Sequence, residues 1–377
     1  MRIAIVLVGY CRIHSILRLF ESLERAKYRV LVDLVFSIDK SPFQDKICAE
    51  IRKLEWPYGE KKVRTFPQRL GLREHILSCG DLTDTYDAVV VLEDDIVVSD
   101  CFYDYVLKSI SFVQDDDKVA GISLYSPSIN EMAMLPFVPK RTGFDNYYLQ
   151  SAQSWGQCWT RRMWQDFRKW YDLNSTLLEA APDMPSRIYS WPESSWKKYY
   201  MKYLVDTDKT FFYPYDSYSS NYSDVGQHNL VVTPHFQVPL ISGKQEFRFG
   251  TMDEVPCYDV FFERTGLTHH REDVCLDLYG TRKQSTCRYF LTTNDIKAPR
   301  ISSYGLTYRP HEDNYVHSAP GCDIHLYDLI GQRELRKKGG SVSYKLAKYH
   351  TNLSWKHSLV YGVVTLIDRI IQKVIKK

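Results

Sequence analysis

Short apolar runs alternate with amphipathic stretches through the N-terminal part of the chain. The apolar runs predict four strands, at Ile3–Val8, Leu31–Ile38, Lys62–Thr65 and Tyr86–Leu92. Apolar residues recur at helical spacing in three intervening stretches, Ile13–Lys27, Lys46–Leu54 and Gln68–Cys79. Regular alternation of strands and helices is typical of a parallel sheet covered by helices, with right-handed crossovers.

The rest of the chain is less regular. Further strands are predicted at Val119–Leu124, Trp155–Trp159 and Thr210–Pro214, and further helices at Phe102–Val113, Arg161–Tyr171 and Ser194–Leu204. Residues 126–150 are rich in Pro and Gly and are expected to form a loop. Residues 245–332 suggest short strands and loops. We therefore predict a main α/β domain at 1–244, an accessory lobe at 245–332 and a tail at 333–377.

The tail is distinguished by a basic, amphipathic pattern. From residue 355 onward apolar residues recur at helical spacing, and basic residues occupy the other face. Residues 333–377 carry eleven Lys and Arg against two acids, a net charge of +9, so the remaining chain carries −6 of the overall +3. This pattern favours a helix lying at an anionic membrane surface. A helix packed on the domain or on a second subunit is the alternative, which leaves a homodimer open.

Three consecutive carboxylates, Glu93, Asp94 and Asp95, directly follow the apolar residues 88–92. Because charges are almost never buried unpaired in a strand, they mark its carboxyl end, where open α/β sheets bind ligands. Such hard oxygen ligands suit Mg²⁺ or Mn²⁺, often shared with substrate phosphates. A solvated acidic turn, with Asp100 capping the next helix, is the alternative interpretation.

Two further residues at predicted strand ends complete a pattern suited to a sugar nucleotide. Arg12 lies in the first strand–helix turn, within reach of a nucleotide, and Asp39 ends the second strand, where it could accept a hydrogen bond from a uracil N–H. Asp95 would hold the cation, which would neutralise a departing diphosphate.

Composition narrows the class of protein. The chain has 377 residues, 44% of them hydrophobic and 25% charged, as in ordinary folded proteins. The nine cysteines include no C-x-x-C pair, which predicts reduced, buried thiols rather than a disulfide framework or a zinc site. No signal peptide and no membrane-spanning run is expected. Basic residues gather on the tail rather than among stacking aromatics, which argues against a nucleic-acid partner.

The segments G-L-R-E-H (71–75) and V-V-V-L-E-D-D-I-V-V-S-D-C-F-Y-D-Y (89–105) resemble nucleotide-sugar glycosyltransferases of the GT-A fold, a Rossmann-like, mostly parallel sheet. The likeness is to N-acetylglucosaminyltransferase I and bacterial enzymes of polysaccharide assembly, and it covers roughly residues 1–235. The segment Q-S-W-G-Q-C-W (153–159) resembles that family's acceptor-side segment.

The resemblance assigns a role to each candidate residue. It implies that Asp95 binds the metal, that Glu93 and Asp94 contact the ribose and donor sugar, and that Arg12 and Asp39 contact the nucleotide. His228 matches the position where many GT-A enzymes supply a late His to the metal or diphosphate, although a surface-loop His is the simpler interpretation.

One departure concerns the catalytic base. The family carries an acidic base on the helix after the acceptor segment, where this chain has Lys197 and Lys198. Inverting transfer needs a base to take the proton of the acceptor hydroxyl. Glu193 is the nearest carboxylate and is our candidate, although it could equally be a helix-terminal charge that favours the dipole.

The sequence therefore predicts a Mn²⁺- or Mg²⁺-dependent inverting hexosyl- or N-acetylhexosaminyltransferase. It would move a sugar from a UDP-sugar to a glycan or lipid-linked acceptor in surface polysaccharide or O-antigen assembly. The predicted location is the cytoplasm of a bacterium, peripheral on the inner face of the cell membrane. A degenerate GT-A domain that binds carbohydrate or scaffolds a complex is one alternative, and a nucleotidyltransferase is another.

Overall fold

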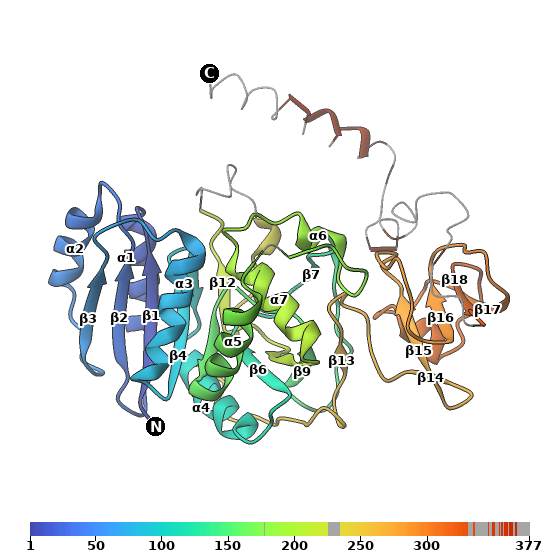
Figure 1. Ribbon diagram of the computed structural model, residues 1–377, viewed down its shortest axis with the longest axis horizontal. Coiled ribbons are helices and arrows are strands. Elements are labelled where there is room, and N and C mark those ends of the chain that lie inside the picture. Colours follow the sequence, from blue (N-terminus) through green and yellow to red (C-terminus); the bar gives the residue numbers. More distant parts are fainter. Residues whose placement is uncertain are drawn as a thin grey trace.

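The computed structural model describes residues 1–176, 178–224 and 234–330, and in the tail residues 335, 346, 349, 350, 354, 356, 358–360, 362–364, 366 and 367. The described chain forms a large mixed sheet covered by helices, a smaller sheet beside it, and a C-terminal helical segment at a distance from both (Figure 1).

The first half of the main sheet is parallel. Its strands β1 (Ile3–Gly9), β2 (Asp33–Ile38), β3 (Lys61–Thr65) and β4 (Ala88–Glu93) lie in the order β4-β1-β2-β3. They alternate with α1 (Ile13–Glu24), α2 (Gln44–Lys53), α3 (Leu72–Gly80) and the short 3-10 helix η1 (Asp81–Asp84). These elements confirm the alternation predicted from the apolar runs.

The second half of the sheet is mixed. Here β6 (Val119–Ser123), β9 (Asn146–Leu149), β10 (Gln157–Thr160), β11 (Thr210–Pro214) and β13 (Cys257–Tyr258) complete the order β13-β9-β11-β6-β10-β4-β1-β2-β3. Strand β10 is antiparallel to both neighbours, β4 and β6, whereas β11 is parallel to β6. Consequently β1, β4, β6 and β11 all point their carboxyl ends to the same edge of the sheet.

The remaining elements cover this sheet or flank it. Helices α3, α5 (Arg161–Asn174) and α7 (Trp196–Asp206) pack against one another in front of the sheet in Figure 1, with α6 (Ser186–Tyr189) beside α7. Helix α4 (Phe102–Val113) contacts β6, and β5 (Ile96–Val98) pairs with β12 (Ser219–Asn221) close to α1. Two short strands, β7 (Ile129–Asn130) and β8 (Leu135–Pro136), form a hairpin, and η2 (Pro234–Phe236) follows the undescribed residues 225–233.

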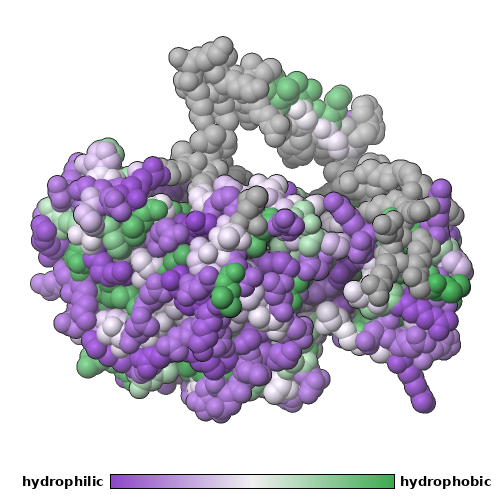
Figure 2. Space-filling view, viewed as in Figure 1, coloured by the Kyte–Doolittle hydropathy of each residue, from purple (hydrophilic) through white to green (hydrophobic). Residues whose placement is uncertain are grey.

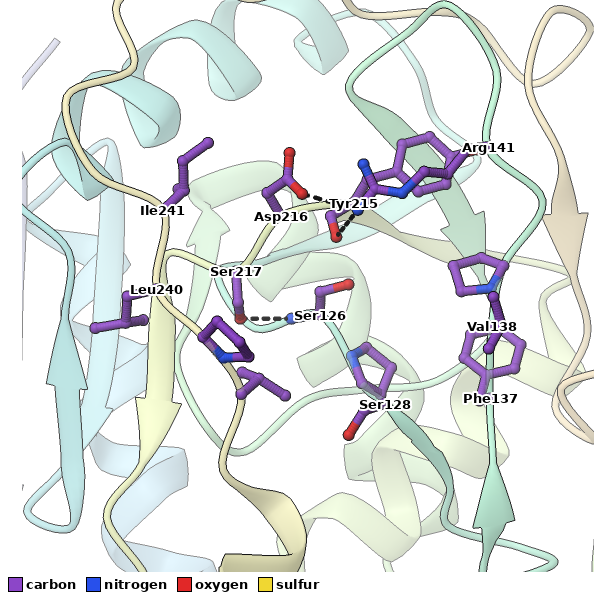
Figure 3. Close-up of a pocket in the computed structure, with 14 residues that line it drawn as sticks. Ser126, Ser128, Phe137, Val138, Arg141, Tyr215, Asp216, Ser217, Leu240 and Ile241 are labelled. Atoms are coloured by element: carbon purple, nitrogen blue, oxygen red, sulfur yellow. Dashed lines mark hydrogen bonds and ion pairs between the residues drawn. The ribbon is translucent and has the colours of Figure 1, made fainter. Parts of the chain in front are cut away.

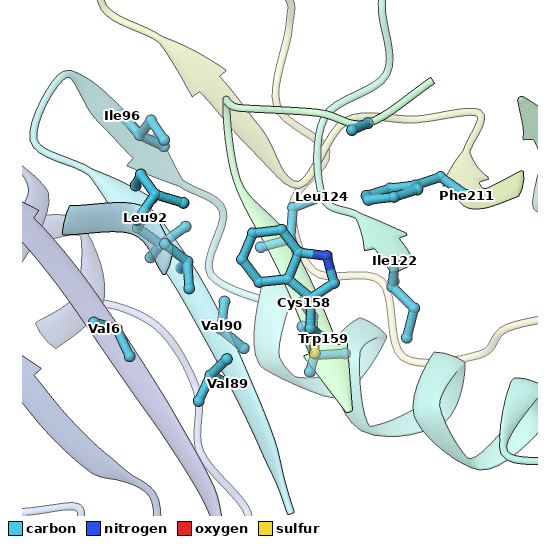
Figure 4. Close-up of a cluster of buried hydrophobic side chains, with 14 of the residues drawn as sticks. Val6, Val89, Val90, Leu92, Ile96, Ile122, Leu124, Cys158, Trp159 and Phe211 are labelled. Atoms are coloured by element: carbon cyan, nitrogen blue, oxygen red, sulfur yellow. The ribbon is translucent and has the colours of Figure 1, made fainter. Parts of the chain in front are cut away.

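A continuous apolar core lies between the sheet and its helices. The strand β4 is buried from Ala88 to Leu92, as expected for a strand covered on both faces. Figure 4 shows Val89, Val90 and Leu92 of β4 beside Cys158 and Trp159 of β10. The ring of Trp159 also packs 4.7 Å from that of Trp164 on α5. This packing holds β4 rigidly and presents its carboxyl end at the edge of the sheet.

The accessory lobe is a five-stranded sheet with its own small core. It consists of β14 (Thr268–His269), β15 (Glu272–Asp277), β16 (Tyr289–Thr292), β17 (Arg300–Tyr304) and β18 (Ile324–Asp328). The short helix α8 (Asp313–Val316) lies between β17 and β18 along the chain. Strand β13 lies beyond the predicted boundary at 244 and pairs with β9, so the main sheet includes residues from the start of the predicted lobe.

Two sequence predictions are corrected by the described structure. Cys275 and Cys287 form a disulfide, so the expectation of nine reduced thiols is wrong. The two cysteines are 12 positions apart in the sequence, and the pairing of β15 with β16 brings them together. Residues 126–150, predicted as a loop, contain β7, β8 and β9. The buried N-Y-Y-L of β9 is too short for alternation to reveal it.

The described part of the tail exposes apolar side chains. Leu359, Val360, Val363, Val364 and Leu366 are each about half or more exposed, and Figure 2 shows these residues as an apolar patch on the projecting helix. Among the described residues, no helix combines the length and apolarity needed to cross a membrane. The described tail residues thus present an exposed apolar face that could contact a lipid surface. Binding of the tail to a membrane stays a prediction.

A pair of histidines joins the tail to the lobe. The ring of His311 stacks 4.9 Å from Tyr349 and lies 4.7 Å from His350. Burial lowers the pKa of His311 to about 3, and that of His350 to about 4. Both rings are therefore neutral in the folded protein at pH 7.

We expect acid to destabilise this contact. Because the folded-state pKa of His311 is depressed, the unfolded chain binds the proton first, and stability falls as pH drops below about 6.5. The wild type should lose about 2 kcal/mol more than a His311→Phe variant between pH 7 and pH 5, since one pKa unit corresponds to about 1.4 kcal/mol. Urea unfolding at both pH values measures this difference. The exposed His14→Asn is the control, and equal losses in His311→Phe and wild type would contradict the expectation.

Candidate active site

The candidate site lies at the edge of the sheet where β1, β2 and β4 end. Parallel registers place Val8 of β1 level with Glu93, and Gly9 level with Ile38. The residues that follow these strands therefore emerge side by side. The sheet thus brings Arg12, Asp39 and the three carboxylates to one edge.

Arg12 is the cation of this cluster. Its Nη2 forms a short ion pair with Asp94 Oδ1, its Nε donates to Asp94 Oδ2 at 3.3 Å, and Nη2 lies 3.7 Å from Asp95 Oδ2. A fork of this kind holds one carboxylate in a fixed orientation. Asp94 is thereby committed to Arg12, whereas the ion pair of Asp95 within the described part of the chain is the longer, 3.7 Å contact with Arg12.

The cluster holds more negative charge than its cation neutralises. Burial raises the pKa of Asp94 to about 6, against the opposing effect of Arg12. Burial, followed by repulsion from Asp95 and Asp94, raises the pKa of Glu93, and burial also raises that of Asp95. All three carboxylates are destabilised as anions, so the site favours a further cation.

Asp39 anchors the loop that closes the site. Its carboxylate accepts the backbone N–H groups of Lys40 at 2.7 Å, Leu70 at 2.9 Å and Gly71 at 3.0 Å. Gly71 has φ of 77°, a conformation that L side chains rarely adopt, and it is the N-cap residue directly before α3. Asp39 therefore positions the 70–71 backbone, with room for about one more hydrogen bond.

A cavity of about 140 Å³ opens between these residues. Asp39, Glu93 and Asp94 line it, together with residues from the end of β1 and the start of α3, namely Val8, Gly9, Tyr10, Cys11, Arg12, Arg69, Gly71, Leu72 and His75. His75 Nε2 lies 2.9 Å from Ser37 Oγ, and burial lowers its pKa to about 4, so the ring is neutral at pH 7. The cavity is thus a mixed polar and apolar slot beside the acids.

Trp155 lies beside strand β12, near the acids. Its backbone carbonyl accepts the Ser219 hydroxyl at 2.6 Å, and β12 pairs with β5, which directly follows the acids. The Trp155 ring lies 4.9 Å from Tyr125 and 4.7 Å from Phe236. These three rings form an aromatic wall next to the carboxylates.

A larger cavity of about 540 Å³ lies further along the same edge (Figure 3). It is formed after β6 by residues 126–128 and after β11 by residues 215–217, with residues 137–141 and 238–241 opposite. Ser126 N donates to Ser217 Oγ at 2.8 Å, and Arg141 pairs with Asp216 at 2.8 Å. Because strands are about 4.8 Å apart, β6 and β11 place this cavity about 10–15 Å from the end of β4.

Two buried lysines on α7 each pair with a glutamate. Lys197 Nζ lies 2.8 and 2.9 Å from the two Glu131 oxygens. Lys198 forms a short ion pair with Glu193, which also accepts the Tyr199 hydroxyl at 2.5 Å. Glu193, the predicted base, lies in the segment before α7 and is held there by Lys198 and Tyr199. Glu131 was missed by sequence reasoning, because it lies in a segment predicted as a loop.

The strand β12 continues into the site. Tyr222 N donates to the Asp95 carbonyl at 2.7 Å, and Asp224 accepts Ser15 Oγ at 2.6 Å and pairs with Arg18. Asp224 adds negative charge near Arg12 and the acids. The predicted ligand His228 lies outside the described residues, four positions beyond Asp224.

A divalent cation fits this site by charge and by donor chemistry. The excess of carboxylate charge calls for a cation, and oxygen is the ligand that Mg²⁺ and Mn²⁺ prefer. Among the residues that the structure describes, no group of three or more His, Cys, Asp or Glu is placed to hold a metal ion. A cation would therefore be held by Asp95 and complete its coordination largely from substrate phosphates.

No protein family profile and no curated protein matches the chain. Solved structures with similarity include the mannosyltransferase PcManGT from Pyrobaculum calidifontis in complex with GDP-Man and Mn²⁺, at 9% identity and TM-score 0.33 over 45% of this chain and 46% of that one. S. aureus TarS 1–349 in complex with UDP matches at 14% identity and TM-score 0.36, over 58% and 60%. GalNAc-T7 with UDP, GalNAc and Mn²⁺ matches at 12% identity and TM-score 0.37, over 57% and 42%.

The chain spans about half the length of the solved structures it matches. They are glycosyltransferases of the GT-A type, the class that the sequence resembles. Their TM-scores lie below 0.5, so the likeness decides nothing about the chemistry of this chain.

Proposed function

We propose that this protein is a metal-dependent inverting glycosyltransferase that uses a UDP-sugar donor. The observation that carries the proposal is the excess of carboxylate charge at the end of β4, in the lining of one cavity and on the same sheet edge as a second, larger one. One cavity suits a nucleotide and the other a sugar acceptor, and the acids lie where the two substrates would meet.

The smaller cavity is the proposed nucleotide site. At about 140 Å³ it is below the roughly 300–1,000 Å³ of a typical ligand pocket, so we expect it to take the base. Asp39 would accept the uracil N–H with its remaining hydrogen-bonding capacity, and Arg12 would approach the phosphates. Asp95 would hold Mn²⁺ or Mg²⁺, which supplies Lewis-acid stabilisation of the departing diphosphate.

The larger cavity is the proposed acceptor site. Its hydroxyl groups at Ser126 and Ser128 and the Arg141–Asp216 pair offer polar contacts, and Phe137 and Tyr215 offer aromatic surface. This mixture suits a saccharide, free or lipid-linked, because a sugar ring presents hydroxyls at its rim and C–H groups on its faces.

Calorimetric titration with UDP, GDP and CMP, with and without Mn²⁺, tests the donor class. We expect UDP to bind and Mn²⁺ to strengthen that binding at least tenfold. Incubation with UDP-sugars should then release UDP. Release of pyrophosphate would favour a nucleotidyltransferase, and metal-strengthened UDP binding without cleavage would favour a degenerate GT-A domain. Absence of nucleotide binding would contradict the proposal.

We further propose that the tail holds the enzyme on an anionic membrane surface, where a lipid-linked acceptor would lie. The support is the exposed apolar face at 359–367 and the net +9 charge of residues 333–377. Replacing Val363 and Ile367 with Asp should lower the fraction bound to phosphatidylglycerol vesicles at least tenfold in a sedimentation assay. Ser358→Asp, on the same helix, is the control. Unchanged binding of the double variant would favour a packing role for the helix.

A further inference from the structure

Two glutamates, Glu131 and Glu193, are candidates for accepting the acceptor's proton, and each is paired with a lysine of α7. Lys197 and Lys198 stand where the resembling enzymes carry an acid, and each brings a glutamate from another part of the chain. The side chain of Glu193, held by Lys198, is 45% exposed, whereas that of Glu131, held by Lys197, is 14% exposed. Glu131 is thus the carboxylate enclosed by the protein.

A rigid turn presents Glu131. The preceding Asn130 is fully buried, and its Oδ1 accepts the backbone N–H groups of Met132 at 2.8 Å and Ala133 at 3.2 Å. Its Nδ2 donates to the Phe261 carbonyl at 3.1 Å. Three hydrogen bonds from one buried amide lock the turn, so the direction of the Glu131 side chain is set by the backbone as well as by Lys197.

Lys197 ties Glu131 to the reacting edge of the sheet. Its ammonium lies 5.9 Å from the centre of the Trp155 ring and 5.6 Å from that of Trp191. The Trp155 carbonyl accepts the Ser219 hydroxyl at 2.6 Å, and Ser219 belongs to β12, which pairs with β5 directly after the acids. The Glu131–Lys197 pair therefore lies beside the aromatic wall, next to the segment that carries the acids.

By contrast, the contacts of Glu193 belong to the packing of α7 against α3. One oxygen pairs with Lys198 and the other accepts the Tyr199 hydroxyl, which in turn accepts Arg73 Nη1 at 2.9 Å. Lys198 also donates to the Trp191 carbonyl at 3.1 Å. This network links the segment before α7 to α3, which gives Glu193 a structural role.

We propose that Glu131 is the carboxylate that accepts the proton of the acceptor hydroxyl. The inference rests on the proposed sugar transfer. The acceptor oxygen forms a bond to the anomeric carbon of the donor sugar, while the bond from that carbon to the diphosphate oxygen breaks and its electron pair leaves with the diphosphate. The hydroxyl proton passes to a Glu131 oxygen, and Lys197 stabilises the carboxylate before the transfer.

The test compares Glu131→Gln with Glu193→Gln in the full-length protein. UDP release is measured from a panel of UDP-sugars with Mn²⁺, with water or p-nitrophenyl glycosides as acceptors, and UDP affinity is measured by calorimetry. Glu131→Gln should lower the rate of UDP release roughly 10²–10⁴-fold while UDP affinity stays within twofold of wild type. Glu193→Gln should retain the rate within threefold.

Chemical rescue distinguishes a proton acceptor from a structural ion pair. Added formate should restore part of the UDP release in Glu131→Ala, because a small carboxylate can occupy the vacated place; Glu193→Ala should show no such response. Unfolding midpoints of each variant establish that it is folded.

Three outcomes overturn the inference. Wild-type release rates in Glu131→Gln, or loss of activity in a folded Glu131→Ala without formate rescue, would show that Glu131 takes no proton. A wild type that binds UDP but cleaves no donor, or binds no nucleotide, would remove the transfer reaction itself. The wild-type measurement alone reveals that result, so a failure of the proposed transfer reaction is distinguishable from a failure of the role proposed for Glu131.

Discussion

Replacing Asp95 with Ala should abolish the metal-dependent binding of UDP and reduce sugar transfer by roughly 10²–10³-fold or more. Asp95 is the one carboxylate of the acidic triplet that is neither committed to Arg12 by a fork nor placed within β4. Without it a cation would lose its proposed protein ligand at this edge of the sheet. Calorimetry with UDP and Mn²⁺, followed by an assay of UDP release, measures both losses.

The same substitution should not destabilise the protein. Burial raises the pKa of Asp95, which means that its charge is unfavourable in the folded state without a cation. In chelator, Asp95→Ala should therefore unfold at a urea concentration equal to or above that of wild type. Asp172→Ala, at a side chain 65% exposed, is the control and should bind UDP as wild type does. Retained Mn²⁺-dependent UDP binding in Asp95→Ala would exclude Asp95 as the metal ligand.

Replacing Arg12 with Met should cost roughly 3 kcal/mol of stability at pH 8, because removing one partner of a buried ion pair leaves the other uncompensated. Asp94 is 5% exposed, and both of its carboxylate oxygens contact the Arg12 guanidinium. Met keeps much of the side-chain volume, so the loss reports the charge. Urea unfolding of the metal-free protein measures it.

The Arg12 prediction is checked by a control variant and by the addition of Mn²⁺. Arg141→Met removes an ion pair whose arginine is 64% exposed, and it should change stability by less than about 1 kcal/mol. Mn²⁺ should restore part of the stability of Arg12→Met, since a cation can replace the missing charge. A loss in Arg12→Met no larger than that in Arg141→Met would show that Arg12 does not balance the acids.

The sequence by itself determined the parallel half of the sheet and the edge where the chemistry lies. Four apolar runs of strand length, separated by amphipathic stretches, leave few arrangements other than β1 to β4 with their helices. The charges of Glu93, Asp94 and Asp95 cannot continue a buried strand, so their place at its end followed from burial energetics alone. Arg12 and Asp39 followed because parallel strands end at one edge.

Only the tertiary structure decided the mixed half of the sheet, the disulfide and the partners of the two lysines. Strand β9 is four residues long, and Cys275 meets Cys287 through the pairing of β15 with β16. Glu131 reaches Lys197 across 66 positions of sequence. Local patterns report which residues must be buried or exposed, but the partner of a buried charge is selected by packing between distant segments. For that reason the acids could be predicted from sequence, whereas the carboxylate proposed to face them could be found only in the folded protein.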